Sequence, residues 1–102
     1  MSVELLYFDG CPNWRLTDQR LREALRLAGR CDEVVYRRVE TAEQAVDLGF
    51  HGSPTLLVDG RDPLAVPDAQ VGLACRVFRT PAGLAGAPTV EQLVALLRAE
   101  SD

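Results

Sequence analysis

The chain has 102 residues, of which 47% are hydrophobic and 25% are charged, and its formal net charge is −4. This length suits a single domain over residues 1–102 with one hydrophobic core. The negative charge argues against nucleic acid and anionic membranes as main partners, since both attract basic proteins. We expect no targeting segment, because the first apolar run, "VELLYF", contains Glu4 and is too short for a signal peptide or a membrane span. A cytoplasmic location is the default expectation.

The first part of the chain alternates strand and helix patterns. Residues 3–8 predict a buried strand that ends at Asp9 and Gly10. Residues 13–28 predict a helix that stops at Gly29. Residues 33–39, "EVVYRRV", are rich in β-branched side chains and predict a second strand. The apolar stripe of the helix has the spacing i, i+3, i+4, i+7, and its members are Leu21, Ala24, Leu25 and Ala28.

A capping-box pattern, Thr41 with Gln44, predicts a short helix over residues 42–48. Its inner face is expected to consist of Ala42, Ala45 and Val46. Residues 55–60, "TLLVDG", predict a third strand, and residues 73–79, "LACRVFR", a fourth.

The same capping-box pattern, Thr89 with Gln92, opens a last helix. The apolar stripe of that helix is Val90, Leu93, Val94 and Leu97. Between the third and fourth strands, the loop over residues 60–72 is long for a link between antiparallel neighbours. We expect it to lie away from Cys11, with Asp62 and Asp68 in solvent.

The element order βαβαββα predicts an α/β fold. The first two strands flank a crossover helix and are expected to be parallel and adjacent. The last two strands are expected to form a hairpin-type pair. The prediction is a mixed four-stranded sheet with helices on both faces, two on one face and the short one on the other.

Cys11 stands between the first strand and the first helix, directly before Pro12. Proline is favoured at the first helical position, so Cys11 is expected at or beside the N-cap. Free helix N–H groups and the helix dipole stabilise an anion there, and the pKa of a thiol at such a site is lowered. One hypothesis is therefore a reactive thiol. The other is a small buried hydrophobic residue, as free cysteines often are.

Two motifs within this element order resemble the thioredoxin-like superfamily, and the resemblance covers nearly the whole chain. "GCPNW", residues 10–14, is similar to a glutaredoxin-type Cys-Pro-x-Cys motif with Trp14 in place of the last cysteine. "GFHGSPTLLVDG", residues 49–60, is similar to the thioredoxin segment in which Pro-Thr opens a strand. The resemblance implies a cis Ser53–Pro54 bond in a loop that faces Cys11. It also implies that the Ser53 backbone pairs with a bound thiol peptide.

Two departures from the family pattern remove the two-thiol chemistry. Trp14 replaces the resolving cysteine, and Leu5 stands where thioredoxins carry a buried acidic residue. What remains is exchange with glutathione or another small or protein thiol or disulfide. The resemblance thus implies a monothiol-type thiol/disulfide oxidoreductase without a cofactor. Cys11 would be its nucleophile, and its substrate-binding residues would be Ser53, Pro54 and Trp14.

Three further residues are candidate modulators of Cys11. His51 is expected either near the thiol, as a cation or a base, or in solvent on its turn. Asp9 opposes an anion at the site. Cys75 is expected roughly 15 Å short of Cys11, because the fourth strand reaches this end of the sheet near Thr80. Both a Cys11–Cys75 bond and a buried Cys75 stay open.

If the first helix forms, Cys31 is excluded as a disulfide partner of Cys11 within one molecule. It follows the first helix, about 27 Å from Cys11 along the helix axis, whereas a disulfide needs Cα atoms within about 7 Å.

The alternative hypothesis is a non-catalytic binding module. A surface with Trp14 and Pro54 would then hold a protein partner or a soft metal, although Trp14 equally fits simple packing. The sequence has no Cys-x-x-Cys and only one histidine, so we expect no tetrahedral metal site. Mercury needs fewer thiolates, and organomercurial-lyase chemistry would draw on Cys11, Cys75 and Asp9. The oligomeric state is not indicated.

Overall fold

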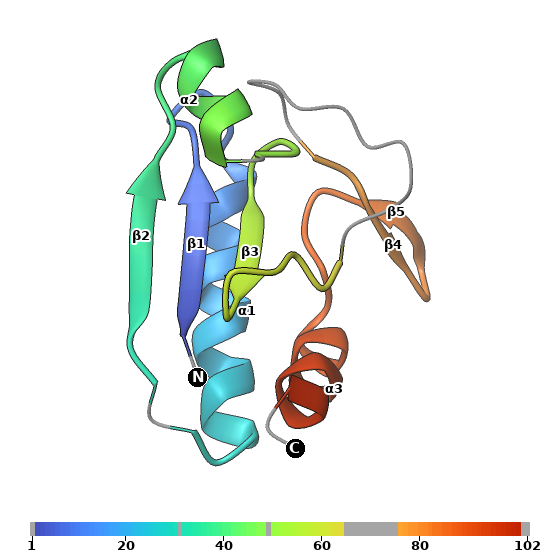
Figure 1. Cartoon of the computed structure of the whole chain (residues 1–102). Coiled ribbons are helices and arrows are strands. Elements are labelled where there is room, and N and C mark those ends of the chain that lie inside the picture. Colours follow the sequence, from blue (N-terminus) through green and yellow to red (C-terminus); the bar gives the residue numbers. More distant parts are fainter. Residues whose placement is uncertain (1, 31, 49, 65–75, 101–102) are drawn as a thin grey trace.

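The computed structural model describes residues 2–30, 32–48, 50–64 and 76–100 (Figure 1). Three strands form a mixed sheet in the order β2-β1-β3, in which β1 is parallel to β2 and antiparallel to β3. The strands of this sheet are β1 (Val3–Tyr7), β2 (Val34–Arg38) and β3 (Thr55–Val58). The helices are α1 (Asn13–Leu27), α2 (Ala42–Leu48) and α3 (Val90–Glu100). The predicted α/β class, the mixed sheet and the parallel pair of first strands are confirmed.

The predicted fourth strand of this sheet is wrong for the residues that the structure describes. Residues 73–75 lie outside those residues, and the strand β4 (Phe78–Thr80) pairs with β5 (Gly83–Ala85) in a separate antiparallel hairpin. Local turn chemistry favours the pairing of β4 with β5. Gly83 adopts φ 110°, which favours glycine, and the Thr80 hydroxyl donates to the Gly83 carbonyl at 2.6 Å. The chain after β4 therefore turns back on β4 itself.

Two helices, α1 and α3, pack against one face of the sheet and enclose the main core. Figure 1 shows α1 running behind the strands. The apolar stripes predicted for both helices supply most of this core, and both strands β1 and β3 contribute to it. Its buried members are Val3, Leu21, Ala24, Leu25, Leu56, Val58, Leu93 and Leu97.

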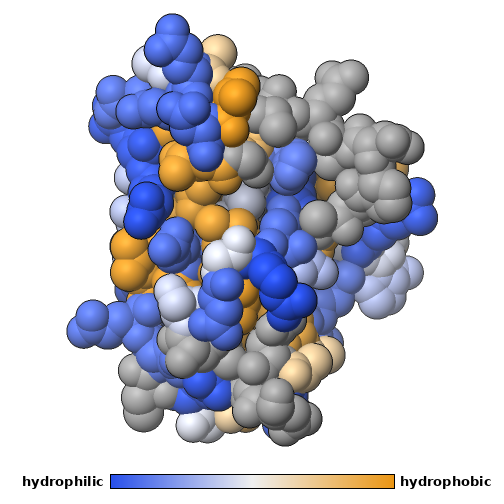
Figure 2. Space-filling model, viewed as in Figure 1, coloured by the Kyte–Doolittle hydropathy of each residue, from blue (hydrophilic) through white to orange (hydrophobic). Residues whose placement is uncertain are grey.

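The opposite face of the sheet carries a smaller cluster beneath α2, made of Leu6, Val39, Ala45 and Phe50. The predicted inner face of α2 is only partly right, because Ala42 is exposed and Val46 is 69% exposed. A helix of seven residues makes about two turns and here buries only Ala45. Figure 2 shows hydrophobic surface over this side of the sheet. The short helix therefore covers its face incompletely.

Both predicted capping boxes are present. The Gln44 N–H donates to the Thr41 hydroxyl at 3.1 Å, and the Thr41 N–H donates to the Gln44 side chain at 3.3 Å. The corresponding distances at Thr89 and Gln92 are 3.1 Å and 2.8 Å. These bonds satisfy helix N–H groups that otherwise lack partners, and they set the starts of α2 and α3. In the described part of the chain, no helix is long and apolar enough to cross a membrane.

The two valines Val58 and Val46 give a matched test of this arrangement. Val58 is fully buried, so Val58→Ala is expected to lower the free energy of unfolding by about 2 kcal/mol through lost burial and a cavity. Val46→Ala removes the same atoms from an exposed site and should change it by less than about 0.5 kcal/mol. Denaturant unfolding of both variants measures the difference. Equal losses would contradict the placement of α2.

Candidate functional site

Cys11 lies in the turn that joins β1 to α1. Its N–H donates to the Phe8 carbonyl at 3.2 Å. Pro12 has helical backbone angles, φ −72° and ψ −13°, and is the N-cap of α1, one position earlier relative to the helix than expected. Cys11 thus lies beside the N-cap, as predicted.

The thiol of Cys11 contacts the loop before β3. Its Sγ lies 3.5 Å from the Ser53 carbonyl oxygen, to which the thiol donates. The Arg76 N–H donates to the same oxygen at 2.9 Å. We call these three residues, Cys11, Ser53 and Arg76, the Ser53 junction. The Ser53 hydroxyl also accepts from the Phe8 N–H at 3.3 Å, which ties this loop to the end of β1.

The resemblance correctly implied where this loop would lie. The Ser53–Pro54 peptide bond is cis, and the loop faces Cys11. The exposure of these residues differs from the expectation. Cys11 and Ser53 are 0% exposed, and Pro54 is also fully buried. A binding surface in this conformation therefore excludes Pro54.

The Ser53 carbonyl has no spare capacity for the expected pairing with a peptide. A carbonyl oxygen has two lone pairs, and the Cys11 thiol and the Arg76 N–H both donate to this one. A thiol peptide that paired with this oxygen would have to displace one of the two donors. Substrate contact at the Ser53 junction therefore requires rearrangement.

Arg76 lies at the end of the sheet where Thr80 was expected. The returning chain was expected to reach this end of the sheet near Thr80, but the Arg76 N–H already contacts Ser53. The premise that set Cys75 roughly 15 Å short of Cys11 is therefore wrong. Cys75 and Cys31 lie outside the described residues. Cys11 is a free, buried cysteine in this structure, so the predicted disulfide at Cys11 is not formed.

An ion pair that the sequence did not reveal anchors Arg76. Its guanidinium donates to both carboxylate oxygens of Asp62, at 2.7 Å and 3.3 Å, and to the Leu64 carbonyl at 2.6 Å. The Arg76 and Asp62 side chains are only 8% and 9% exposed. The expectation that Asp62 lies in solvent is wrong, because this buried guanidinium takes the place of water. In the sequence, this ion pair is indicated only by a long loop with an acidic and a basic residue 14 positions apart.

Trp14 packs on the end of the sheet beside the Cys11 turn. Its ring stacks on Tyr7 with centroids 4.1 Å apart, and the Arg15 guanidinium lies 5.6 Å from the Trp14 ring centre. Tyr7 is the last residue of β1, and Trp14 lies in the first turn of α1. The stack therefore holds the beginning of the helix against the end of the strand, which agrees with the packing interpretation of Trp14.

The two charged modulators lie in different settings. Asp9 is exposed and forms an ion pair with Arg38 at 3.1 Å, so a nearby cation offsets the charge expected to oppose an anion. His51 is on the turn before Ser53, and its Nδ1 is shielded from solvent without a hydrogen-bond partner in the described part of the chain. A fully solvated His51 is therefore wrong. No hydrogen bond joins it to Cys11 among the described residues, and its role as a base stays a prediction.

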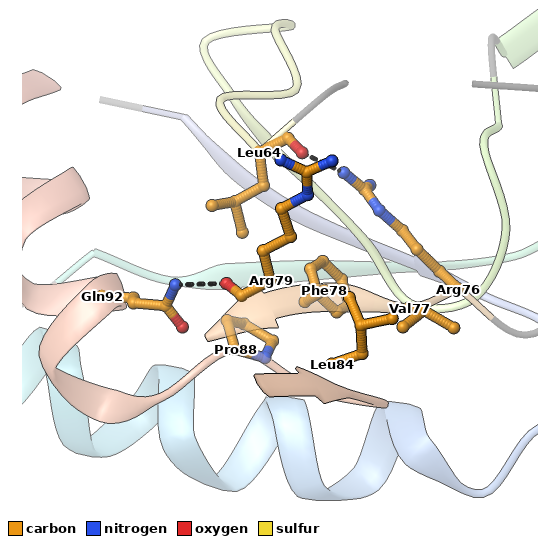
Figure 3. Close-up of a pocket in the computed structure, with 8 residues that line it drawn as sticks. All are labelled: Leu64, Arg76, Val77, Phe78, Arg79, Leu84, Pro88 and Gln92. Carbon is orange, nitrogen blue, oxygen red and sulfur yellow. Dashed lines mark hydrogen bonds between the residues drawn. The ribbon is translucent and has the colours of Figure 1, made fainter. Parts of the chain in front are cut away.

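A cavity of about 640 Å³ lies next to Arg76 and was not predicted from the sequence (Figure 3). It is mainly apolar, and the side chain of Gln92, one of its lining residues, donates to the Arg79 carbonyl at 2.7 Å. Its lining consists of Leu64, Arg76, Val77, Phe78, Arg79, Leu84, Pro88 and Gln92. Within the described residues, no three His, Cys, Asp or Glu side chains are grouped to hold a metal ion.

No family model, curated protein or solved structure matches this chain. The likeness to the thioredoxin-like superfamily therefore stays a hypothesis drawn from the residues themselves. The functional proposal therefore rests on the geometry of the Ser53 junction.

Trp14, the only tryptophan, reports on the aromatic stack. Tyr7→Ala should shift the Trp14 emission to longer wavelength and lower the free energy of unfolding, because stacking adds about 0.5–1.5 kcal/mol to the area term. Tyr7→Phe keeps the ring and should leave both nearly unchanged. Fluorescence during denaturant unfolding measures both quantities. An unchanged spectrum for Tyr7→Ala would show that the stack does not form in solution.

Proposed function

We propose that this chain is a thioredoxin-like protein whose Cys11 exchanges with small thiols and disulfides. The observation that carries the proposal is the 3.5 Å contact between the Cys11 thiol and the Ser53 carbonyl. The two motifs of the resemblance are 42 residues apart at these positions, yet they meet at one point.

The reaction has two exchange steps. The Cys11 thiolate, after losing its proton to solvent, attacks one sulfur of a small disulfide and forms a mixed disulfide, while the other sulfur leaves as a thiolate. A second small thiolate then attacks the small-molecule sulfur of the mixed disulfide and releases Cys11. Trp14 stands where a resolving thiol would be, so a thiol from solution performs this second step.

Access limits this chemistry. Because Cys11 is 0% exposed, a disulfide reaches its sulfur only after local opening separates the thiol from Ser53. The observed rate should therefore equal the open fraction multiplied by the intrinsic exchange rate. Slow exchange that does not depend on low concentrations of denaturant is the expected signature, since a local opening exposes little surface.

The test uses bis(2-hydroxyethyl) disulfide with glutathione as reductant. Wild-type protein, Cys31→Ser and Cys75→Ser should all form the mixed disulfide at Cys11, seen by peptide mass spectrometry, and should accelerate exchange above the uncatalysed rate. Cys11→Ser should lose at least about 90% of that acceleration, because it removes the thiol that contacts the Ser53 carbonyl. Full activity in Cys11→Ser would overturn the proposal.

The complete burial of Cys11 and Ser53 favours one other function, a non-catalytic binding module in which Cys11 packs as a hydrophobic side chain. The exchange assay separates the two functions. A module would leave Cys11 unmodified under native conditions, and Cys11→Ala would then retain the fold without any exchange to lose. A partner or a soft metal would have to bind elsewhere, or after the same opening.

A further inference from the structure

We infer that Arg76 is a positioning residue for Cys11, and that its ion pair with Asp62 sets how often the thiol becomes accessible. The inference deepens the proposed function and rests on it for its biological meaning. The physical claim concerns only the protection of Cys11, which can be measured without any exchange activity.

Arg76 contacts both the Ser53 carbonyl and Asp62. The backbone N–H of Arg76 donates to the Ser53 carbonyl at 2.9 Å, and its side chain binds Asp62 and the Leu64 carbonyl. Figure 3 shows the Arg76 side chain extending toward Leu64. A side chain fixed at its far end restricts its own backbone. The ion pair therefore helps to hold the N–H on Ser53.

The ion pair between Arg76 and Asp62 is largely shielded from solvent. An ion pair between two exposed side chains would contribute little to stability. The Arg76 and Asp62 side chains, however, are 8% and 9% exposed and are joined by two hydrogen bonds. The guanidinium also lies 4.6 Å from the centre of the Phe78 ring. Arg76 is thus held by a carboxylate, a carbonyl and an aromatic ring. Loss of one charge would leave the other buried without its partner.

The Ser53 carbonyl oxygen connects Arg76 to the Cys11 thiol. The Arg76 N–H and the Cys11 thiol donate to the same oxygen, so the position of that oxygen determines both contacts. When the guanidinium is released from Asp62, the Arg76 N–H that donates to this carbonyl is held in place less firmly. The contact between Cys11 and Ser53 should then open more often, and the thiol should react faster.

The experiment measures iodoacetamide alkylation of Cys11 in the full chain, by peptide mass spectrometry, at low denaturant concentrations. Two variants are used, Arg76→Met and the double variant Asp62→Asn with Arg76→Met. The single variant leaves Asp62 buried and charged, whereas the double variant removes both charges and should recover much of the lost stability. Both should alkylate Cys11 faster than wild type by about tenfold or more, with little dependence on denaturant.

Arg30→Met is the matched control. Arg30 pairs with Asp32 at 2.7 Å, in the connection between α1 and β2 rather than at the Ser53 junction. This variant should leave the local opening of Cys11 unchanged even where it lowers Tm. If Arg76→Met fails to fold, the double variant decides the question. The inference is overturned if the alkylation rate of the double variant equals that of wild type, because the ion pair then acts on stability alone.

The exchange assay separates this inference from the proposed function. Faster alkylation in the Arg76 variants without any exchange activity would leave the positioning role intact and remove the proposed chemistry. Exchange at Cys11 together with unchanged alkylation in the double variant would support the proposed chemistry and remove the positioning role of Arg76.

Discussion

The Ser53 carbonyl oxygen joins three parts of the chain that are distant in sequence. It accepts from Cys11, in the turn between β1 and α1, and from Arg76, which precedes β4. Ser53 itself lies directly before Pro54 and β3. The sheet brings the end of β1 beside the beginning of β3, because Leu6 pairs with Thr55 in the antiparallel register. The register of these two strands therefore determines whether Cys11 can meet the Ser53 loop at all.

The burial of the Ser53 junction has two opposite effects. It strengthens the hydrogen bonds at Ser53, since water does not compete for the carbonyl. It also shields the Cys11 sulfur, which is 0% exposed and reaches a reagent only through local opening. A thiol in such a place is protected in the closed state and available in the open one. The balance between the two states, rather than the nucleophilicity of the thiol alone, would govern its chemistry.

Much of the fold could be predicted because its signals are local. The capping boxes at Thr41 and Thr89 and the apolar stripes of α1 and α3 depend on residues within a few positions of each other. The meeting of Cys11 with Ser53 was also anticipated, but through a resemblance between two motifs rather than through spacing. That part of the candidate site rests on the combination of a strand-ending cysteine and a Ser-Pro-Thr sequence.

The remaining features depend on contacts that no local pattern encodes. Asp62 and Arg76 have the composition of a solvated loop, and only the tertiary fold removes water from them. Val46 is exposed despite its apolar character, because the short helix α2 buries only Ala45. The hairpin of β4 and β5 consists of two three-residue strands, which are too short to give a periodic signal.

Native-state hydrogen exchange of the Arg76 amide, compared with alkylation of Cys11 in the same sample, tests the central claim most directly. If both groups are held by the Ser53 carbonyl, one opening event should release them together. The Arg76 amide should then be protected, with an opening equilibrium within about threefold of the value obtained from Cys11. An Arg76 amide that exchanges at the rate of an unfolded peptide, while Cys11 stays protected, would contradict the shared junction.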